Sequence, residues 1–389
     1  MRIAISGASG YIGQHLSSFL EGKGYDVIPL GRDLFKEDCF DELCRCVESC
    51  EVVINLAGAS INKRWTEAYK QELYDSRICV TRQLVHAINT RSVKLELFIS
   101  ASAVGYYPAF GEYDEYHDCR GMDFLARLCG AWEEEASACS SDVRLVITRF
   151  GVVLSEDGGA LKEMLRLQRF SRVSVVIGNG QQRFPWISLF DLCRSFGYII
   201  RNRQMRGVVN LVSPDLITQK QLAHTLARAD KIRRIIPLPE FFFRLKFGEG
   251  ASFVTKGQTV HPSKLQESGF TYIYPTIEKL MNITDHHTVP ELDVKRYMGR
   301  WYEIARYENH FERGMTDVTA TYTLLPDGKI RVENEGYKGG VHKKATGRAK
   351  QPDPKNNPGK LKVAFFLWFY ADYYILELDA DYQLSLIHI

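Results

Sequence analysis

Apolar and polar positions along residues 1–283 follow two alternating patterns. Short, nearly continuous apolar runs end at glycine or polar residues, and between them apolar side chains recur at helical spacing, as in Ile12, Leu16, Phe19 and Leu20. Parallel strands that are covered by helices on both faces have this appearance. We therefore predict an α/β domain with a doubly wound parallel sheet, whose first five strands fall at residues 2–6, 25–32, 51–58, 95–107 and 144–154.

The pattern changes near residue 287. The stretch "ITDHHTVPELD" (283–293) is polar and contains Pro290. Beyond it, strand-like segments such as "RWYEIARY" and "VTATYTLL" alternate with turn sequences such as "PDG" and "PDPKNNPGK". Short strands at this spacing are typical of an antiparallel meander or barrel, so we predict a second, all-β domain.

Composition narrows the class of protein. The 389 residues have a formal net charge of +3 and no basic block, which gives no argument for nucleic-acid binding. No apolar run reaches the length of a membrane span, and the start "MRIAISGASG" lacks the apolar core of a signal peptide. The nine cysteines all precede residue 194; their odd number and the absence of a CxxC pair indicate reduced thiols rather than a metal site, and hence a cytoplasmic protein.

The first strand leads directly into the glycine motif "GASGYIG". Gly7 permits a tight turn, Gly10 permits close approach of the backbone to a diphosphate, and Gly13 permits close packing of the following helix. Backbone amides at the start of that helix would then face the phosphates. Glycines alone are weak evidence, but the strand–turn–helix context predicts a Rossmann-like dinucleotide site.

The end of the second strand bears on the choice of dinucleotide. An acidic residue there accepts hydrogen bonds from a ribose hydroxyl, whereas an arginine pairs with a 2′-phosphate. Arg32 comes first and favours NADP, while Asp33 keeps NAD open.

Residues 1–283 resemble the extended short-chain dehydrogenase/reductase superfamily, in its epimerase-family (NAD-dependent epimerase/dehydratase-like) branch. The match includes "GASGYIG", "NLAGASINKRW", "SASAVGYYP", "FLARLCGAWEEEA", "RFGVVLSEDGGAL", "FPWISLFDL" and "HPSKLQESGF", the last in a DUF1731-type C-terminal segment. The resemblance implies that the cofactor is bound by Gly7, Ser9, Gly10, Tyr11, Ile12, Gly13, Arg32, Leu56, Ala57 and Gly58.

The catalytic pattern of that superfamily is incomplete in this chain. The superfamily uses a Ser, which Ser102 matches, and a Tyr followed four residues later by a Lys, whose charge lowers the Tyr pKa. The corresponding positions hold Leu125 and Cys129. Three explanations stay open: Tyr106 or Tyr107 acts as the acid, the protein binds nucleotide without turnover, or the reaction needs no Tyr acid, as in reduction of a flavin-like or quinone-like acceptor.

Two further side chains are candidates for contact with a small-molecule substrate. Arg77 lies on the helix after the third strand and could meet a phosphate or carboxylate, although a surface ion pair is an equal alternative. Trp186 lies in the "FPWISLFDL" segment, where the family usually has His at the position of Ser188. That replacement argues against a proton relay through residue 188.

The second domain resembles bacterial, apolipoprotein-D-type lipocalins. The signature "GRWYEIARY" carries Gly-x-Trp, and the resemblance extends to residue 382. It implies a β-cup for an apolar ligand such as a fatty acid. The proposed contacts are Trp301, Tyr302, Tyr322, Tyr337 and Phe366. The final "LSLIHI" does not match the lipocalin continuation, so we expect an incomplete barrel with an unpaired edge.

Together these patterns predict an NADP(H)-binding oxidoreductase or epimerase-like protein of unknown substrate, fused to a lipid-binding lipocalin module. The alternative is a catalytically silent nucleotide sensor or scaffold joined to an apolar-ligand carrier. A homodimer stays open. The expected divisions are a dinucleotide domain (1–215), a C-terminal family segment (216–283), a linker (284–292) and the lipocalin part (293–389).

Overall fold

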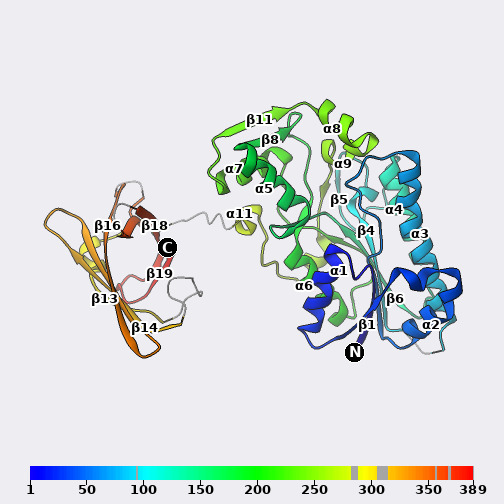
Figure 1. Cartoon of the computed structure of the whole chain (residues 1–389), viewed down its shortest axis with the longest axis horizontal. Helices are drawn as coiled ribbons and strands as arrows, with labels where there is room; N and C mark the ends of the chain where they lie inside the picture. Colours follow the sequence, from blue (N-terminus) through cyan, green and yellow to red (C-terminus); the bar gives the residue numbers. More distant parts are fainter. Residues whose placement is uncertain (93–94, 282–287, 305–313, 355–356, 367–368, 389) are drawn as a thin grey trace. The chain divides into compact units, whose positions relative to one another are not determined.

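The computed structural model describes residues 1–92, 95–281, 288–304, 314–354, 357–366 and 369–388. The chain divides into two compact units, Met1–Ile283 and Thr284–Ile389 (Figure 1).

The N-terminal unit is built on a six-stranded parallel sheet with the order β10-β6-β4-β3-β1-β2. Its strands are β1 (Arg2–Ser6), β2 (Asp26–Leu30), β3 (Val52–Asn55), β4 (Leu97–Ala103), β6 (Arg144–Phe150) and β10 (Gly207–Leu211). From β1 the chain moves outward to β2 and then crosses back to β3 on the other side. In such sheets ligands bind at the carboxyl ends of the strands where the order reverses, here between β1 and β3.

Helices cover both faces of this sheet, as the sequence predicts (Figure 1). Alternate residues of β1 point to opposite faces: Ile3 and Ile5 join the core beneath α1 (Tyr11–Glu21) and α6 (Leu189–Arg201), whereas Ala4 joins the other core. That second core lies beneath α2 (Phe40–Glu48), α3 (Glu67–Thr90) and α4 (Phe124–Ser137). The prediction of a doubly wound α/β fold is confirmed.

Smaller elements extend the unit beyond the carboxyl ends of the strands. Three two-stranded parallel pairs join β8 to β11, β7 to β9 and β5 to β12. The elements are β5 (Glu112–Tyr113), β7 (Val152–Ser155), α5 (Gly159–Ser171), β8 (Val173–Ile177), β9 (Trp186–Ser188), α7 (Gln219–Ala229), β11 (Arg234–Leu238), α8 (Glu240–Phe247), α9 (Ser252–Thr255), β12 (Thr259–Val260), α10 (Ser263–Glu267) and α11 (Ile277–Leu280).

Buried Asp191 attaches the end of this unit to α6. Its carboxylate accepts hydrogen bonds from the backbone N–H groups of Ile273 and Tyr274, at 2.9 and 2.7 Å, and from Arg194. Ser188, where the family usually has His, accepts a hydrogen bond from the Asp191 amide and caps α6. In this chain residue 188 therefore has a helix-capping role.

The C-terminal unit is a seven-stranded antiparallel sheet in which neighbours follow chain order. A short helix, α12 (Val294–Tyr297), precedes β13 (Gly299–Tyr302), β14 (Met315–Leu324), β15 (Ile330–Lys338), β16 (Val341–Lys350), β17 (Lys360–Phe366), β18 (Phe369–Leu378) and β19 (Ser385–His388). One face carries a buried cluster that includes Tyr322, Val332 and Ile375, and we call it the core face. The sheet curls into a half-barrel, which confirms the predicted incomplete lipocalin fold.

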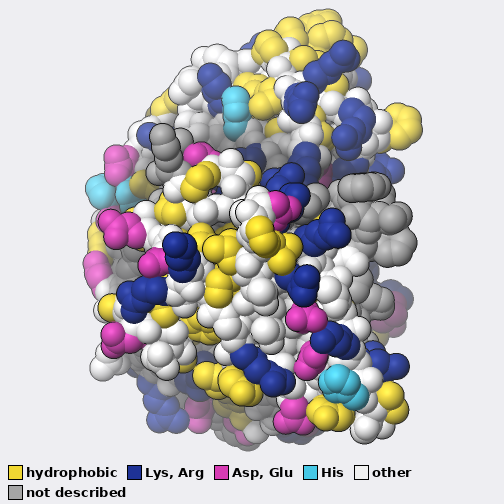
Figure 2. Space-filling model, turned by 90° about the vertical axis from the view of Figure 1, so that its left-hand side faces the viewer, with side chains coloured by type: hydrophobic (Ala, Val, Ile, Leu, Met, Phe, Trp, Pro, Cys, Tyr) yellow, Lys and Arg dark blue, Asp and Glu magenta, His cyan; other side chains and the backbone are white. Residues whose placement is uncertain are grey.

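The surface carries both signs of charge. Figure 2 shows a face on which Lys and Arg side chains are interspersed with Asp and Glu. Among the described residues no helix is long and apolar enough to cross a bilayer. Within the same residues no group of His, Cys, Asp and Glu has the arrangement of a metal site.

A buried arginine joins β6 to the carboxyl end of α6. The Arg144 guanidinium donates to the carbonyls of Ile199, Ile200, Asn202 and Met205, at 3.1–3.3 Å. Burial lowers the pKa of Arg144, but the partial negative charge of the helix end favours a cation at this point.

We predict that Arg144→Met lowers the free energy of unfolding by about 2–3 kcal/mol, because it removes four hydrogen bonds to buried or half-buried carbonyls. Among the described residues, only the Asn202 carbonyl of these four keeps a backbone donor, the Met205 amide. Chemical denaturation measures the change. Arg203→Met is the matched control: Arg203 is exposed and pairs with Glu96 at the surface, so little change is expected. Equal stability of the Arg144 variant and wild type would contradict the assignment.

Candidate functional site

The turn after β1 and the loop after β3 touch through their backbones. Gly7 has a φ of +72°, a conformation that favours glycine, and a Cβ on Gly7 would lie 2.8 Å from the carbonyl of Leu56. A Cβ on Gly13 would lie 2.2 Å from the Gly7 oxygen. Glycine is therefore required at both positions for α1 to begin directly beside the two strands.

The start of α1 presents unpaired backbone donors. Gly10 is the N-cap and supplies no side chain, and the first helical hydrogen bond runs from the Gln14 amide to the Gly10 carbonyl. The amides of Tyr11, Ile12 and Gly13 consequently have no acceptor within the helix. Such a helix start suits the phosphates of a dinucleotide, so the geometry fits the predicted cofactor cradle.

Arg32 stands at the end of β2, where it begins a 3-10 turn, η1 (Arg32–Phe35). Asp33 forms an ion pair with Lys36, whose ammonium lies 2.6 Å from the carboxylate and lowers the Asp33 pKa. Arg32 is exposed and has no ion-pair partner in the described part of the chain. Of the two residues weighed for nucleotide choice, Arg32 is the one with its charge available.

The loop after β3 is held from below by buried polar side chains. Asn55 accepts a hydrogen bond from Ser6 (2.6 Å) and donates to Thr81 (2.7 Å). Its oxygen also accepts from the Ala57 amide at 3.3 Å. These contacts fix Leu56 and Ala57 beside the glycine turn.

Arg77, on α3, lies against the same loop. Its guanidinium donates to the carbonyls of Ala59 (3.0 Å) and Leu73 (3.1 Å) and lies 5.2 Å from the Trp132 ring centre. A Cβ on Gly58 would lie 2.9 Å from the guanidinium carbon. The surface ion pair that was the alternative for Arg77 is not observed among the described residues.

Ser102, at the end of β4, belongs to a buried ionic cluster. Its hydroxyl donates to Glu133 at 2.6 Å, and Arg149 binds both oxygens of Glu133 at 2.8 and 2.7 Å. Burial opposes the charge of Arg149, but the hydrogen bonds and charge of Glu133 outweigh it and raise the Arg149 pKa. Sequence reasoning missed Glu133 and Arg149, although both lie within matched family segments.

The two tyrosines after β4 differ in access. Tyr107 is 2% exposed, and its hydroxyl donates to the Asp114 carbonyl (2.9 Å) and the Asn210 side chain (3.1 Å). Tyr106 is half-buried, with its ring 3.5 Å from the Arg149 guanidinium carbon and its hydroxyl 3.2 Å from Asp118. Burial raises the pKa of both tyrosines. Tyr107 thus has a packing role here, and Tyr106 is the accessible phenol.

The structure places Leu125 and Cys129 beside these groups. A Cβ on Gly105 would lie 3.4 Å from Leu125 and 4.0 Å from the Cys129 sulfur. Burial raises the pKa of the Cys129 thiol to about 12, so it is neutral at physiological pH. Neither residue can replace the missing Tyr and Lys.

Trp186 does not face a ligand. Its side chain is fully buried and packs with Leu154, Leu161 and Leu165, and no described residue accepts a hydrogen bond from its indole N–H. This burial corrects the expectation that Trp186 contacts substrate.

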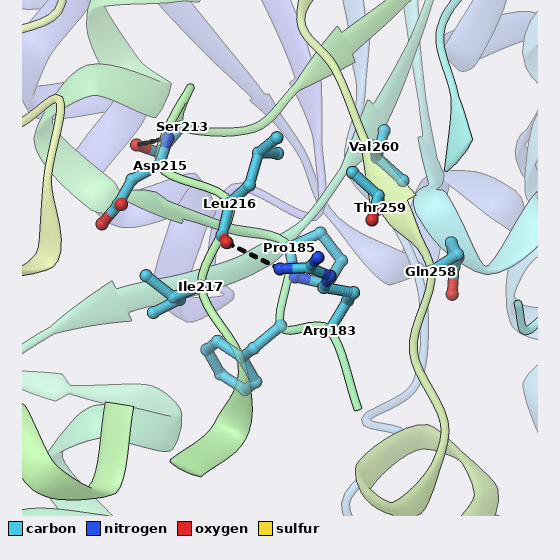
Figure 3. Close-up of a pocket in the computed structure, with 10 residues that line it drawn as sticks. Arg183, Pro185, Ser213, Asp215, Leu216, Ile217, Gln258, Thr259 and Val260 are labelled. Atoms are coloured by element: carbon cyan, nitrogen blue, oxygen red, sulfur yellow. Dashed lines mark hydrogen bonds between the residues drawn. The ribbon is translucent and has the colours of Figure 1, made fainter. Parts of the chain in front are cut away.

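A small pocket lies beside the segment that contains Trp186 (Figure 3). Arg183 points into it and donates to the Leu216 carbonyl at 3.1 Å, next to Ser213, Asp215 and Thr259. Burial raises the Asp215 pKa. Arg183 was missed from the sequence because "QQRFPW" carries no signal beyond a single basic residue.

In the C-terminal unit, strand register separates the predicted ligand contacts. Trp301 pairs with Ala320 and lies with Tyr322 on the core face. Tyr302 pairs with Thr319 on the opposite face and is exposed, as is Tyr337, which pairs with Thr316. The expectation that these two line the interior is therefore corrected. The Phe366 side chain lies outside the described part of the chain.

The core face carries a group of buried hydroxyls. Tyr373 lies 3.1 Å from the Tyr297 hydroxyl and 2.9 Å from that of Tyr322, and Ser385 lies 3.4 Å from Tyr297. The Trp301 indole donates to the Tyr297 carbonyl at 2.9 Å. Polar oxygen atoms thus converge within an otherwise apolar face.

Three family models match the chain. The NAD dependent epimerase/dehydratase family covers residues 3–211, a domain of unknown function (DUF1731) covers 238–282, and a lipocalin-like domain covers 292–388.

Similar proteins match the N-terminal part. A chloroplastic SDR39U1 homolog of Arabidopsis thaliana, described as an epimerase family protein, is 33% identical over 72% of this chain and 85% of its own length. The epimerase family protein YfhF of Bacillus subtilis is 34% identical over 74% of this chain and all of its own length. The crystal structure of human SDR39U1 (isoform 2) with NADPH is 31% identical, with a TM-score of 0.67, over 74% of this chain and all of that one.

Proposed function

The chain belongs to the NAD-dependent epimerase/dehydratase family, and from that premise we propose that its N-terminal unit is an NADP(H)-binding oxidoreductase acting on a small molecule. The observation that carries the proposal is the glycine turn packed on Leu56, which leaves the first amides of α1 unpaired. The NADPH in the structure of the human relative supports it.

Arg32 supports NADP over NAD. Its guanidinium has no partner among the described residues, whereas Asp33 is paired with Lys36. A guanidinium without an ion-pair partner among the described residues suits a 2′-phosphate, whereas the Asp33 charge is partly offset by Lys36 in an exposed ion pair.

We predict that NADPH raises the melting temperature of the full chain more than NADH does, and that Arg32→Ala removes the difference. Thermal-shift titration with both nucleotides measures it. Arg45→Ala, a change at another basic residue of the unit, is the control and should keep the preference. A preference that survives Arg32→Ala would exclude this role.

Bound NADP(H) supplies a hydride donor or acceptor at its nicotinamide ring. Ser102 is 2% exposed and its hydroxyl donates to Glu133, so we propose that it supports Tyr106 through this buried cluster, in which Arg149 binds Glu133 and lies against the Tyr106 ring. Tyr106 is the accessible group that can give a proton to a substrate oxygen. Burial raises the Tyr106 pKa, which makes the phenol a weaker acid, and the charge of the nearby Arg149 acts in the opposite direction.

We predict that Tyr106→Phe lowers NADPH-dependent carbonyl reduction by about 100-fold or more, and that Ser102→Ala lowers it by about tenfold. The wild-type rate should stay level across neutral pH and fall only as pH rises through the Tyr106 pKa, above its ordinary value of 10.0. Nicotinamide absorbance, followed with a panel of carbonyl and quinone acceptors, measures both effects.

Tyr74→Phe, a change at an exposed tyrosine of α3, is the control and should leave the rate unchanged. A Tyr106→Phe enzyme as fast as wild type would overturn the assignment.

A second candidate function is nucleotide binding without turnover. It is favoured by Leu125 and Cys129, which provide neither a proton nor a charge beside Ser102. Nucleotide binding with no NADPH consumption by any acceptor would support it against the oxidoreductase.

For the C-terminal unit we propose binding of an apolar ligand with a polar head, such as a fatty acid. The lipocalin-like match and the core face with Trp301, Tyr322 and its hydroxyl group support the proposal.

We also propose residues 284–292 as the linker between the units, and a cytoplasmic location in keeping with nine free cysteines.

We predict that the full chain binds a fluorescent fatty acid and that Tyr322→Trp weakens binding by about tenfold, because a larger side chain fills the core face. Tyr302→Trp is the matched control on the opposite, exposed face and should bind like wild type. Fluorescence titration measures both. Equal losses in the two variants, or no binding by wild type, would contradict the assignment.

A further inference from the structure

The site lacks a positive charge on α4. Where the superfamily has a Lys four residues after its Tyr, this chain has the buried thiol of Cys129. A neutral thiol cannot attract the oxygen atoms of a ribose or phosphate as an ammonium does. A nucleotide bound across the ends of β1 and β3 would therefore lack that contact.

A cation from another helix stands at the same place. Arg77 of α3 lies against Trp132, three residues after Cys129 on α4, and its guanidinium rests on Gly58, in the loop predicted to contact the cofactor. It is held there by the Ala59 and Leu73 carbonyls and by the face of Trp132. The charge is fixed in position rather than carried on a mobile surface side chain.

This cation has no counter-ion among the residues that the structure describes. A guanidinium has five N–H groups, and Arg77 uses two of them on the Ala59 and Leu73 carbonyls. Among the described residues none supplies a carboxylate within ion-pair distance of Arg77. Burial lowers its pKa, so its charged form is held at a cost in desolvation. A ligand that brings anionic or polar oxygens to the remaining N–H groups would offset that cost.

We propose that Arg77 supplies from α3 the positive charge that a Lys at position 129 would supply from α4, and that it binds the nicotinamide half of the dinucleotide. The proposal rests on the proposed nucleotide-binding function and replaces the substrate role first considered for Arg77. Arg32 would bind the adenosine half, so the two arginines hold opposite ends of one ligand. Arg77 is thus a binding and positioning residue for the cofactor.

Two ligands distinguish binding of the nicotinamide half of the dinucleotide from binding of the adenosine half. NADPH contains both, whereas 2′,5′-ADP contains only the phosphorylated adenosine half. For the full chain with Arg77→Gln, we expect the Kd for NADPH to rise about tenfold or more, the size of one lost charge-assisted contact, and the Kd for 2′,5′-ADP to stay within about twofold of wild type. Isothermal titration calorimetry measures both constants.

Arg82→Gln is the matched control, since Arg82 lies on the same helix but pairs with Glu135 at the surface. It should change neither constant. Arg77→Lys keeps the charge and is expected to bind NADPH within about threefold of wild type. If the Gln variant does not fold, the Lys variant decides: a tenfold or larger loss of NADPH affinity in folded protein would overturn the proposal.

Unchanged NADPH affinity in Arg77→Gln, or equal losses for NADPH and 2′,5′-ADP, would also overturn it. Failure of the wild-type chain to bind either ligand would instead refute the proposed nucleotide-binding function. The two failures are therefore distinguishable in one set of titrations.

Discussion

The structure of the site depends on how closely two backbone segments approach each other. The turn after β1 lies against the loop after β3, and neither Gly7 nor Gly13 has room for a Cβ. This contact sets where α1 begins, and therefore where its unpaired amides point. The loop after β3 also brings Gly58 beside the Arg77 guanidinium, so the glycine turn and Arg77 are linked through one short backbone segment.

Around that contact, buried charges are fixed by partners rather than left to solvent. Arg149 is neutralised by Glu133, and the same carboxylate takes the proton of Ser102. Arg77 instead contacts two carbonyls and an aromatic ring, which hold its position, and no described carboxylate compensates its charge. A buried charge without a partner carries a desolvation cost in free energy. A ligand that pairs with Arg77 would offset that cost, whereas Arg149 already has Glu133 as its partner.

Sequence patterns predicted the features that depend on local periodicity and on glycine. The parallel sheet follows from apolar runs joined by helices, and the cradle follows from three glycines between a strand and a helix. The Glu133–Arg149 pair joins α4 to β6, and no local pattern states which carboxylate meets which guanidinium. Arg183 was missed for a similar reason, because its pocket is formed by segments distant in sequence. Trp186 looked like a ligand contact only because its burial could not be read from its neighbours.

The C-terminal unit shows even more clearly that a local sequence pattern does not determine which side chains are buried. Alternation along a strand gives two faces, but only register and burial show which of them is inside. Trp301 and Tyr302 are adjacent in sequence, and pairing with Ala320 and Thr319 sends them to opposite faces. Because neighbouring strands share their faces through register, the buried positions of β14 and β15 determine the inward side for β13 as well. The tyrosine hydroxyls that converge on this side come from α12, β14 and β18, so their meeting is a product of the curl of the sheet and not of any one segment.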